Sequence, residues 1–535
     1  MTYLYYEPTE LITNDNEMQL KVTNLYKKII LGILGFFGAG IVFFLTNQFG
    51  TGITPDSVVY ISVARNLAEG NGFLTYNGLP LVMEPPLYSI LLAIIKIITF
   101  LDPHISAGYV NAILLGLIVF MSGLIMLRHL QSFGLILLGT ISVLISYSII
   151  QASLMALSES LFIFLTLLFF YYLDKYQSSG NYSSLFVFSL VAALACLTRY
   201  TGIIILITGL MGILFWGKKN IKVRLSDAGI FILIAIVPIG IWLTRNYFIS
   251  GTLVGQRGTS SYSLFENIRF WYRTILPWYL PANSTAVYPI YLLLVITLLI
   301  VYIPNKVKSL YWSSTRLICP LLIFMIFYSG LIIISSTTTA YDQISDRLLS
   351  PIYVPILIIL VMLSDKLLTW LTKSFRLKTI TVLLFICFIH LIKSQGGNTR
   401  RVIEEYVNLS GCGYGSELWK KSETIEYLTQ HEGLPGRFTL YSNEPEAVYF
   451  LTNYKATRSP AKTYYNSTQI ININPYQVDL RLDTSNVCLI WFDKADRSFL
   501  YTVEELKRNR QMKEIAHLKD GTIYTLSGKY EQLKL

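Results

Sequence analysis

The sequence predicts a polytopic α-helical membrane protein of about 11 transmembrane helices with a small C-terminal α/β domain. Three observations predict this architecture. The 535-residue chain has a mean hydropathy of +0.51. Only 14% of its residues are charged, whereas a soluble domain has about 25%. Apolar stretches that could cross a bilayer recur over residues 29–393, and residues 394–535 are far more polar.

The chain begins with a polar segment, and residues 1–28 are predicted to lie in the cytoplasm. No small-residue cleavage site follows the first apolar stretch, so we expect no cleavable signal peptide. The formal net charge of +11 is concentrated in the membrane part, because residues 394–535 hold 18 Lys/Arg against 17 Asp/Glu. This distribution argues against nucleic-acid binding.

A crossing needs about 20 apolar residues. The predicted crossings are 29–48, 106–127, 133–151, 159–174, 185–198, 202–216, 228–249, 286–303, 316–336, 349–364 and 379–393. The apolar stretch 185–216 is too long for one crossing and is broken by "TRYTG" at 198–202, so we predict two short helices that meet at Arg199. The short stretch 87–101 contains Lys96 and is predicted to lie at the membrane interface.

The basic residues test this choice of crossings, because cytoplasmic loops are enriched in Lys and Arg. With the N-terminus inside, sixteen basic residues lie on the inner side of the membrane part and nine on the outer side. Twelve of the sixteen are lysines, whereas seven of the nine are arginines. Arginine binds phosphate and carboxylate through a rigid fork. The arginines therefore suggest a function on the outer side, although some could pair with Glu266, Asp342 or Asp346.

The first outer loop, 49–105, contains a predicted helix in the stretch "TPDSVVYISVARNLAEGNGF" (54–73). Thr54 suits the N-cap, Pro55 the first helical position and Gly70 the end of the helix. Asp56 falls in the first turn, where the helix dipole favours an acid. Ordinary helix-start chemistry is thus one explanation of Asp56, and a functional role is the other.

Two further acids lie on the predicted outer side. Glu84 precedes two prolines in "LVMEPPLYS", where it is either a turn residue or a functional one. Glu159 opens the crossing at 159–174, and Ser158 is expected to cap that helix. An acid at membrane depth is a functional candidate by default.

The remaining polar elements on this side carry arginines. Arg199 lies in the break at 198–202, and irregular backbone at membrane depth is tolerated where it lines a polar cavity. Arg245 and Arg257 lie in the aromatic outer loop 244–281, which suits either a mobile cover or an interfacial aromatic belt. Arg347 precedes the crossing at 349–364, where Asp342 or Asp346 could pair with it.

The C-terminal part, 394–535, is predicted to lie outside the cell after a linker at 396–401. Strands are predicted at 438–442, 487–492 and 514–526, and helices at 417–431, 444–452 and 502–509. Cys412 and Cys488 could pair there, which the sequence leaves open. The five cysteines have no metal-binding spacing. The domain has neither a glycine-rich phosphate loop nor a nucleophile–His–acid set, so we expect a lid or an acceptor platform.

The ordered motifs of the membrane part resemble those of the GT-C glycosyltransferases that use polyprenyl-phosphate sugars. The branch is that of protein O-mannosyltransferases and the lipid A aminoarabinose transferase. The matching motifs span residues 29–393 and are "TPDSVVYISVARNLAEGNGF", "MEPPLYSILLAII", "LSESLFIFL", "LTRYTGI", "WLTRNYFISGTLVGQR" and "DRLLSPIYVPIL". The resemblance implies that Asp56 is the catalytic acid on an interfacial helix. The step Glu84-Pro85-Pro86 matches the second loop motif, without the lysine or histidine that some members have there.

The resemblance implies transfer of a monosaccharide from a polyprenyl phosphate at the outer membrane surface, with inversion. Asp56 would be the base. The expected substrate-binding residues are Tyr60, Glu84, Glu159, Arg199, Arg245, Arg257 and Arg347, with Arg245 and Arg347 the preferred phosphate ligands. No cofactor is expected to be required, although Asp56 and Glu159 could in principle hold a divalent metal. The expected partners are the bilayer, the lipid-linked sugar and an acceptor.

Two other functions remain open from the sequence. A lipid or sugar transporter would also be polytopic with intramembrane charges, but the internal repeats common in transporters are not evident. The other possible function is that of a non-catalytic subunit of an envelope complex.

Overall fold

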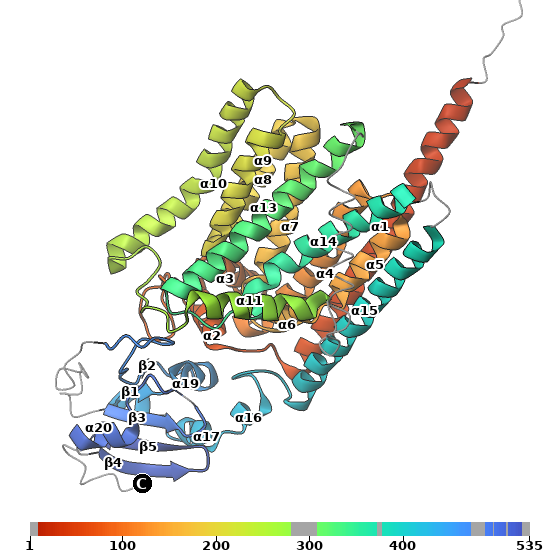
Figure 1. The fold of residues 1–535 in the computed structure, drawn as a ribbon. Helices are drawn as coiled ribbons and strands as arrows, with labels where there is room; N and C mark the ends of the chain where they lie inside the picture. Colours follow the sequence, from red (N-terminus) through yellow and green to blue (C-terminus); the bar gives the residue numbers. More distant parts are fainter. Residues whose placement is uncertain are drawn as a thin grey trace, which may run out of the picture.

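The computed structural model describes residues 9–279, 308–371, 377–471, 487–495, 497–509 and 512–526. The membrane part is a bundle of helices, and the C-terminal domain lies against one end of it (Figure 1). The helices of the membrane part are α1 (Thr9–Phe49), α2 (Pro55–Ala68), α3 (Leu87–Thr99), α4 (Pro103–His129), α5 (Phe133–Leu144), α6 (Tyr147–Leu154), α7 (Glu159–Ser179), α8 (Tyr182–Thr198), the 3-10 helix η1 (Tyr200–Gly202), α9 (Ile203–Trp216), α10 (Ile221–Ser250), α11 (Leu264–Tyr279), α13 (Lys308–Thr338), α14 (Asp346–Leu371) and α15 (Leu377–Asn408).

The chain is a multi-pass membrane protein. Among the described residues, five helices are long and apolar enough to cross a bilayer, or six if α5 and α6, bent by 43°, count as one span. Three shorter apolar helices add to these, namely 87–99, 182–198 and 200–216. Every predicted crossing except 286–303 coincides with one helix or with consecutive helices; 286–303 lies outside the described residues.

Small residues bring the first two long helices together. A Cβ added at Gly35 of α1 would lie only 2.7 Å from the carbonyl oxygen of Gly116 of α4, so the two backbones touch at this point. Close approach through glycine is how helices pack where lipid supplies no hydrophobic driving force. α1 is thereby fixed against α4, which leads out of the first outer loop.

The C-terminal domain contains a five-stranded sheet in the order β2-β1-β3-β5-β4. The strands are β1 (Thr439–Ser442), β2 (Ala456–Arg458), β3 (Val487–Phe492), β4 (Met512–Leu518) and β5 (Gly521–Leu526), and the helices are α16 (Glu417–Lys420), α17 (Glu423–Gln430), α18 (Leu434–Arg437), α19 (Pro445–Thr452) and α20 (Val503–Asn509). β1 pairs in parallel with β2 and β3, and β5 is antiparallel to β3 and β4. Apolar residues of α17 and α19 pack on one face of the sheet, and those of α20 pack on the other.

Three predictions for the C-terminal part are wrong in detail. The stretch 514–526 is a hairpin of β4 and β5 rather than one strand, because the chain turns at Lys519 and Asp520. The helix expected at 417–431 is broken into α16 and α17, since the Ser422 hydroxyl accepts the Ile425 amide and starts a new helix.

The expected linker at 396–401 is instead part of the continuous helix α15. Gln395 of this helix donates to the carbonyl of Trp278, and Thr399 donates to that of Ile145 at 2.6 Å. These contacts with distant segments hold the helix through its two glycines. Cys412 and Cys488 are both free, so they do not form the disulfide that the sequence left open.

Candidate active site

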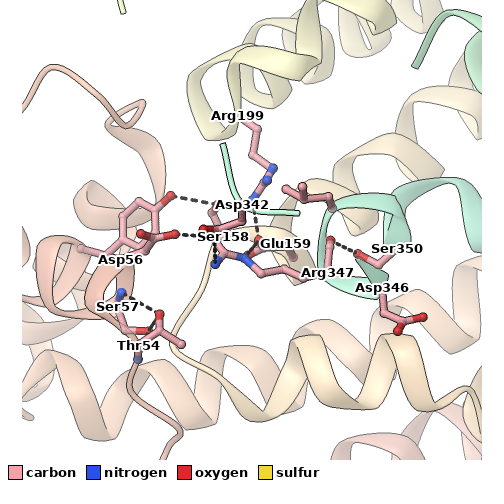
Figure 2. Close-up of polar contacts among 12 residues, drawn as sticks. Thr54, Asp56, Ser57, Ser158, Glu159, Arg199, Asp342, Asp346, Arg347 and Ser350 are labelled. Carbon is pink, nitrogen blue, oxygen red and sulfur yellow. Dashed lines mark hydrogen bonds and ion pairs between the residues drawn. The ribbon is translucent and has the colours of Figure 1, made fainter. Parts of the chain in front are cut away.

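Local sequence explains where α2 begins and why Asp56 is in its first turn. The Thr54 hydroxyl accepts the Ser57 amide and the Ser57 hydroxyl accepts the Thr54 amide, which is a reciprocal cap. Pro55 takes the first helical position, as predicted. The helix ends before Gly70, which has a φ of +82°. The side chain of Asp56 is 40% exposed and lies beside α14 (Figure 2).

Arg347, at the start of α14, binds two carboxylates from distant segments. It donates through Nη2 to Asp56 and through Nε to Glu159 Oε1 at 2.8 Å. A third acid, Asp342, lies 3.8 Å away on the loop before α14. Of the two acids that could pair with Arg347, Asp342 is thus within ion-pair distance, whereas Asp346 points away from this cluster (Figure 2).

Glu159 is the buried member of the cluster. It has no exposed surface and also pairs with Arg199 Nη1 at 2.7 Å. Because an unpaired buried charge is strongly destabilising, both arginines are needed to hold this carboxylate inside the protein. Arg199 is extended between α8 and η1, so the predicted break at "TRYTG" is what brings its guanidinium to Glu159.

Ser158 plays a different part from the one expected. Its side chain makes no capping hydrogen bond to α7. Its hydroxyl instead lies 3.2 Å from the hydroxyl of Tyr60 and accepts from Arg199 at 3.3 Å. Burial raises the pKa of Tyr60 above its ordinary value, so this phenol stays protonated and can donate. Ser158 therefore joins α2 to Arg199, a link without a local sequence signal.

Glu84 and Arg257 belong to the same electrostatic neighbourhood. Burial and the nearby negative charge of Asp56 raise the pKa of Glu84 to about 7, and Arg257 and Arg347 only partly offset this effect. Near neutral pH Glu84 is thus a carboxyl group poised between its acid and its ionised form. The guanidinium of Arg257 also stacks on the ring of Tyr341, at 4.5 Å.

Arg245 lies apart from the carboxylate cluster. It donates to the carbonyl of Leu81 and to Asn246 Oδ1 at 2.9 Å, and it stacks on Trp242. Asn246 and Tyr200 donate to the carbonyl of Val82. In this structure Arg245 therefore supports the loop that carries Glu84, rather than joining Arg347.

The C-terminal domain is docked over these segments. Arg65, in the last turn of α2, donates to both oxygens of Asp102 at 2.9 and 3.0 Å and to Asn453 Oδ1 at the end of α19. On the other side of the cluster, the Tyr465 hydroxyl donates to Asp342 at 3.0 Å. One domain thus contacts both the helix with Asp56 and the loop that leads to Arg347.

The described residues contain no group of three or more His, Cys, Asp or Glu side chains placed to hold a metal ion. The cluster contains a partly exposed carboxylate, Asp56, next to a partly exposed guanidinium, Arg347. Below them lie the fully buried Glu159 and the largely buried Arg199. Such an arrangement can accept a proton beside a site where an anion is stabilised.

The chain is similar to solved structures over most of its length. ArnT from Cupriavidus metallidurans, both apo and bound to undecaprenyl phosphate, aligns with a TM-score of 0.58 at 11% and 12% identity, over 92% of this chain and 97% of that one. The archaeal oligosaccharyltransferase AglB from Archaeoglobus fulgidus, in complex with an inhibitory peptide and a dolichol-phosphate, aligns with a TM-score of 0.52 at 11% identity, over 88% of this chain and 69% of that one.

No protein-family model and no curated protein sequence matches the chain. The likeness to ArnT and AglB extends through the helical bundle into the C-terminal part, since it covers about nine tenths of the chain. This chain has the fold of the GT-C glycosyltransferases.

Proposed function

We propose that this protein is a membrane glycosyltransferase that moves a monosaccharide from a polyprenyl-phosphate donor to an acceptor hydroxyl at the extracytoplasmic face. The observation that carries the proposal is the cluster of Asp56, Glu159, Arg199 and Arg347, which joins a partly exposed acid to guanidinium groups within a GT-C fold. The solved structures of ArnT and AglB with polyprenyl-type phosphates support the class of donor.

In the proposed reaction Asp56 takes the proton of the acceptor hydroxyl. The acceptor oxygen then forms a bond to the anomeric carbon, while the bond from that carbon to the phosphate oxygen breaks and its electron pair leaves with the lipid phosphate. Backside displacement inverts the anomeric centre. Guanidinium groups stabilise the negative charge that develops on the leaving phosphate.

Arg347 is the first candidate for the phosphate, because it is partly exposed and already carries two acids. A phosphate that binds Arg347 competes with Asp56 for the same guanidinium, and the released carboxylate is a stronger base. Arg257 adds positive charge beside Glu84. Tyr60, Glu84 and Glu159 would bind the sugar or position the acceptor, and Arg199 would keep Glu159 in place.

The proposal includes an orientation and a reaction without a metal cofactor. The N-terminus would lie in the cytoplasm and the C-terminal domain outside, in a cell membrane. Arginine near the leaving group supplies the charge that a divalent ion supplies elsewhere. Loss of activity in EDTA with recovery on adding a divalent ion would overturn the metal-free mechanism.

The test is transfer of a radiolabelled sugar from polyprenyl-phosphate donors by the purified full-length protein. Asp56→Asn is expected to reduce kcat by at least about 100-fold, since a general base contributes 10²–10⁴. Glu266→Gln is the matched control, because Glu266 is an outer acid held by Ser263, away from the cluster.

Full activity in Asp56→Asn would remove Asp56 from the role of base. Movement of the labelled lipid across a liposome membrane without transfer would favour the transporter instead.

A further inference from the structure

A cavity lies behind the start of α14, on the side away from Asp56. It has a volume of about 220 Å³, and its lining includes Tyr147, Phe270, Arg273 and Asp346. Asp346 and Arg347 are consecutive residues, but Figure 2 shows the Asp346 side chain directed away from the cluster of Arg347 and Glu159. The cavity is therefore separate from the candidate active site.

Two opposite charges line this cavity without pairing with each other. Arg273 is exposed and forms no ion pair with any residue that the structure describes. Trp278 Nε1 and the Tyr147 hydroxyl donate to Asp346, at 2.6 and 2.8 Å, and both hydrogen bonds end on Oδ1. Among the described residues, this small cavity is thus lined by a cation without an ion-pair partner and by a carboxylate with one oxygen that accepts no hydrogen bond, a pattern that suits a ligand with both charges.

The helix that supplies Arg273 has an exposed apolar stripe. Phe265, Ile268, Tyr272 and Leu276 follow one another at helical spacing on α11 and are 77, 41, 42 and 38% exposed. α11 runs across the end of the bundle that faces the C-terminal domain (Figure 1). An exposed apolar stripe with arginine beside it is typical of a helix that lies at a membrane surface.

We infer that this cavity binds the headgroup of a phospholipid that carries both a phosphate and a primary ammonium group, as phosphatidylethanolamine does. The phosphate would bind Arg273 at the mouth, and the ammonium would donate to Asp346 and lie against the ring of Phe270. The acyl chains would follow the apolar stripe of α11. This inference does not depend on the proposed sugar transfer.

The experiment measures binding of dihexanoyl-phosphatidylethanolamine to the purified full-length protein in detergent by titration calorimetry. Arg273→Gln is expected to weaken binding about tenfold, which is the effect of one charge-assisted hydrogen bond. Arg269→Gln is the matched control: Arg269 is an exposed arginine one turn earlier on the same helix and does not line the cavity. It is expected to change binding less than twofold.

The preference of the protein among lipid headgroups tests the role of Asp346. The wild type should bind the ethanolamine lipid more tightly than the glycerol or choline lipid of the same chain length, and Asp346→Asn should remove that preference while the glycerol lipid still binds. Equal binding of all three lipids by the wild type, or an equal loss in the Arg269 and Arg273 variants, would overturn the assignment. Displacement of the bound ethanolamine lipid by polyprenyl phosphate, and by neither of the other two lipids, would assign the cavity to the donor instead.

Discussion

Arg347 illustrates how one residue can organise a site at the surface of a membrane. Its guanidinium contacts an acid from α2 and a buried acid from α7, and it lies near a third acid on the loop before α14. Breaking a buried ion pair by removing one partner costs about 3–5 kcal/mol. The two acids that Arg347 binds directly are therefore held by the same group that we propose to bind the phosphate, so binding of the donor and release of the base are coupled.

Glu84 makes the fold sensitive to pH in a predictable direction. Its pKa is about 7 in the folded protein against 4.5 ordinarily, so the folded state binds more protons between these values. The contribution of neutral Glu84 to stability is complete below about pH 4.5 and is lost as the pH rises to about 7. The loss is about 3 kcal/mol.

Thermal unfolding in detergent between pH 4.5 and 8 checks this effect. The difference in Tm between the wild type and Glu84→Gln should change over that range and stay constant above about pH 7.5. A difference that is independent of pH would contradict the raised pKa.

At the scale of single elements, the glycine contact between α1 and α4 makes the most specific prediction. A methyl group at Gly35 meets the carbonyl of Gly116 at 2.7 Å, whereas a Cβ at Gly32, one turn earlier, meets nothing within 4 Å. Gly35→Ala should lower the free energy of unfolding by about 1–3 kcal/mol, because the helices must move apart. Gly32→Ala should leave it unchanged or raise it, since alanine favours the helix.

Unfolding in mixed micelles under denaturant measures both variants. Similar values for the two would show that the backbones of α1 and α4 are not in contact.

The elements that sequence reasoning predicted well are those with local causes. The cap formed by Thr54 and Ser57 determines the start of α2, and long apolar runs determine the crossings. Long-range contacts explain the failures. The glycines at 396–397 suggested a linker, but α15 is held by carbonyls of Trp278 and Ile145, more than 100 residues away in the sequence.

In the candidate site, too, some features were predictable from the sequence and others depend on long-range contacts. Glu159 and Arg199 were predicted from charge at membrane depth, Arg347 from its place on the outer side just before a crossing, and Asp56 from the family resemblance. The structure brings all four together. The placement of Arg245 could not be predicted, because its acceptor is the backbone carbonyl of Leu81, which leaves no mark in the sequence.

At the scale of the whole molecule, Arg65 connects the two domains. Its guanidinium donates to Asn453 at the end of α19, and its loss also leaves Asp102 without its arginine. Arg65→Ala should therefore speed hydrogen exchange of the amides of α19 about tenfold or more, while those of β1 and β3 stay protected.

Hydrogen exchange measured by mass spectrometry gives the comparison. Arg400→Ala is the control, because Arg400 is 80% exposed and pairs with Glu404 on its own helix. Uniform deprotection of the C-terminal domain in Arg65→Ala would mean that the variant unfolds the domain rather than undocking it.

Because α15 is one continuous helix, it connects the two domains rigidly and fixes the rotation of the C-terminal domain about the helix axis. One residue inserted near Gly396 would rotate everything beyond it by about 100° and advance it by about 1.5 Å, whereas a flexible tether would absorb the same insertion. Tyr406, whose hydroxyl donates to the carbonyl of Gly50, would then leave its acceptor. Sugar transfer should collapse with one inserted residue and recover in part with four, which nearly completes a turn. Activity that falls and recovers with the helical repeat in this way would show that the last crossing orients the C-terminal domain as well as anchoring it.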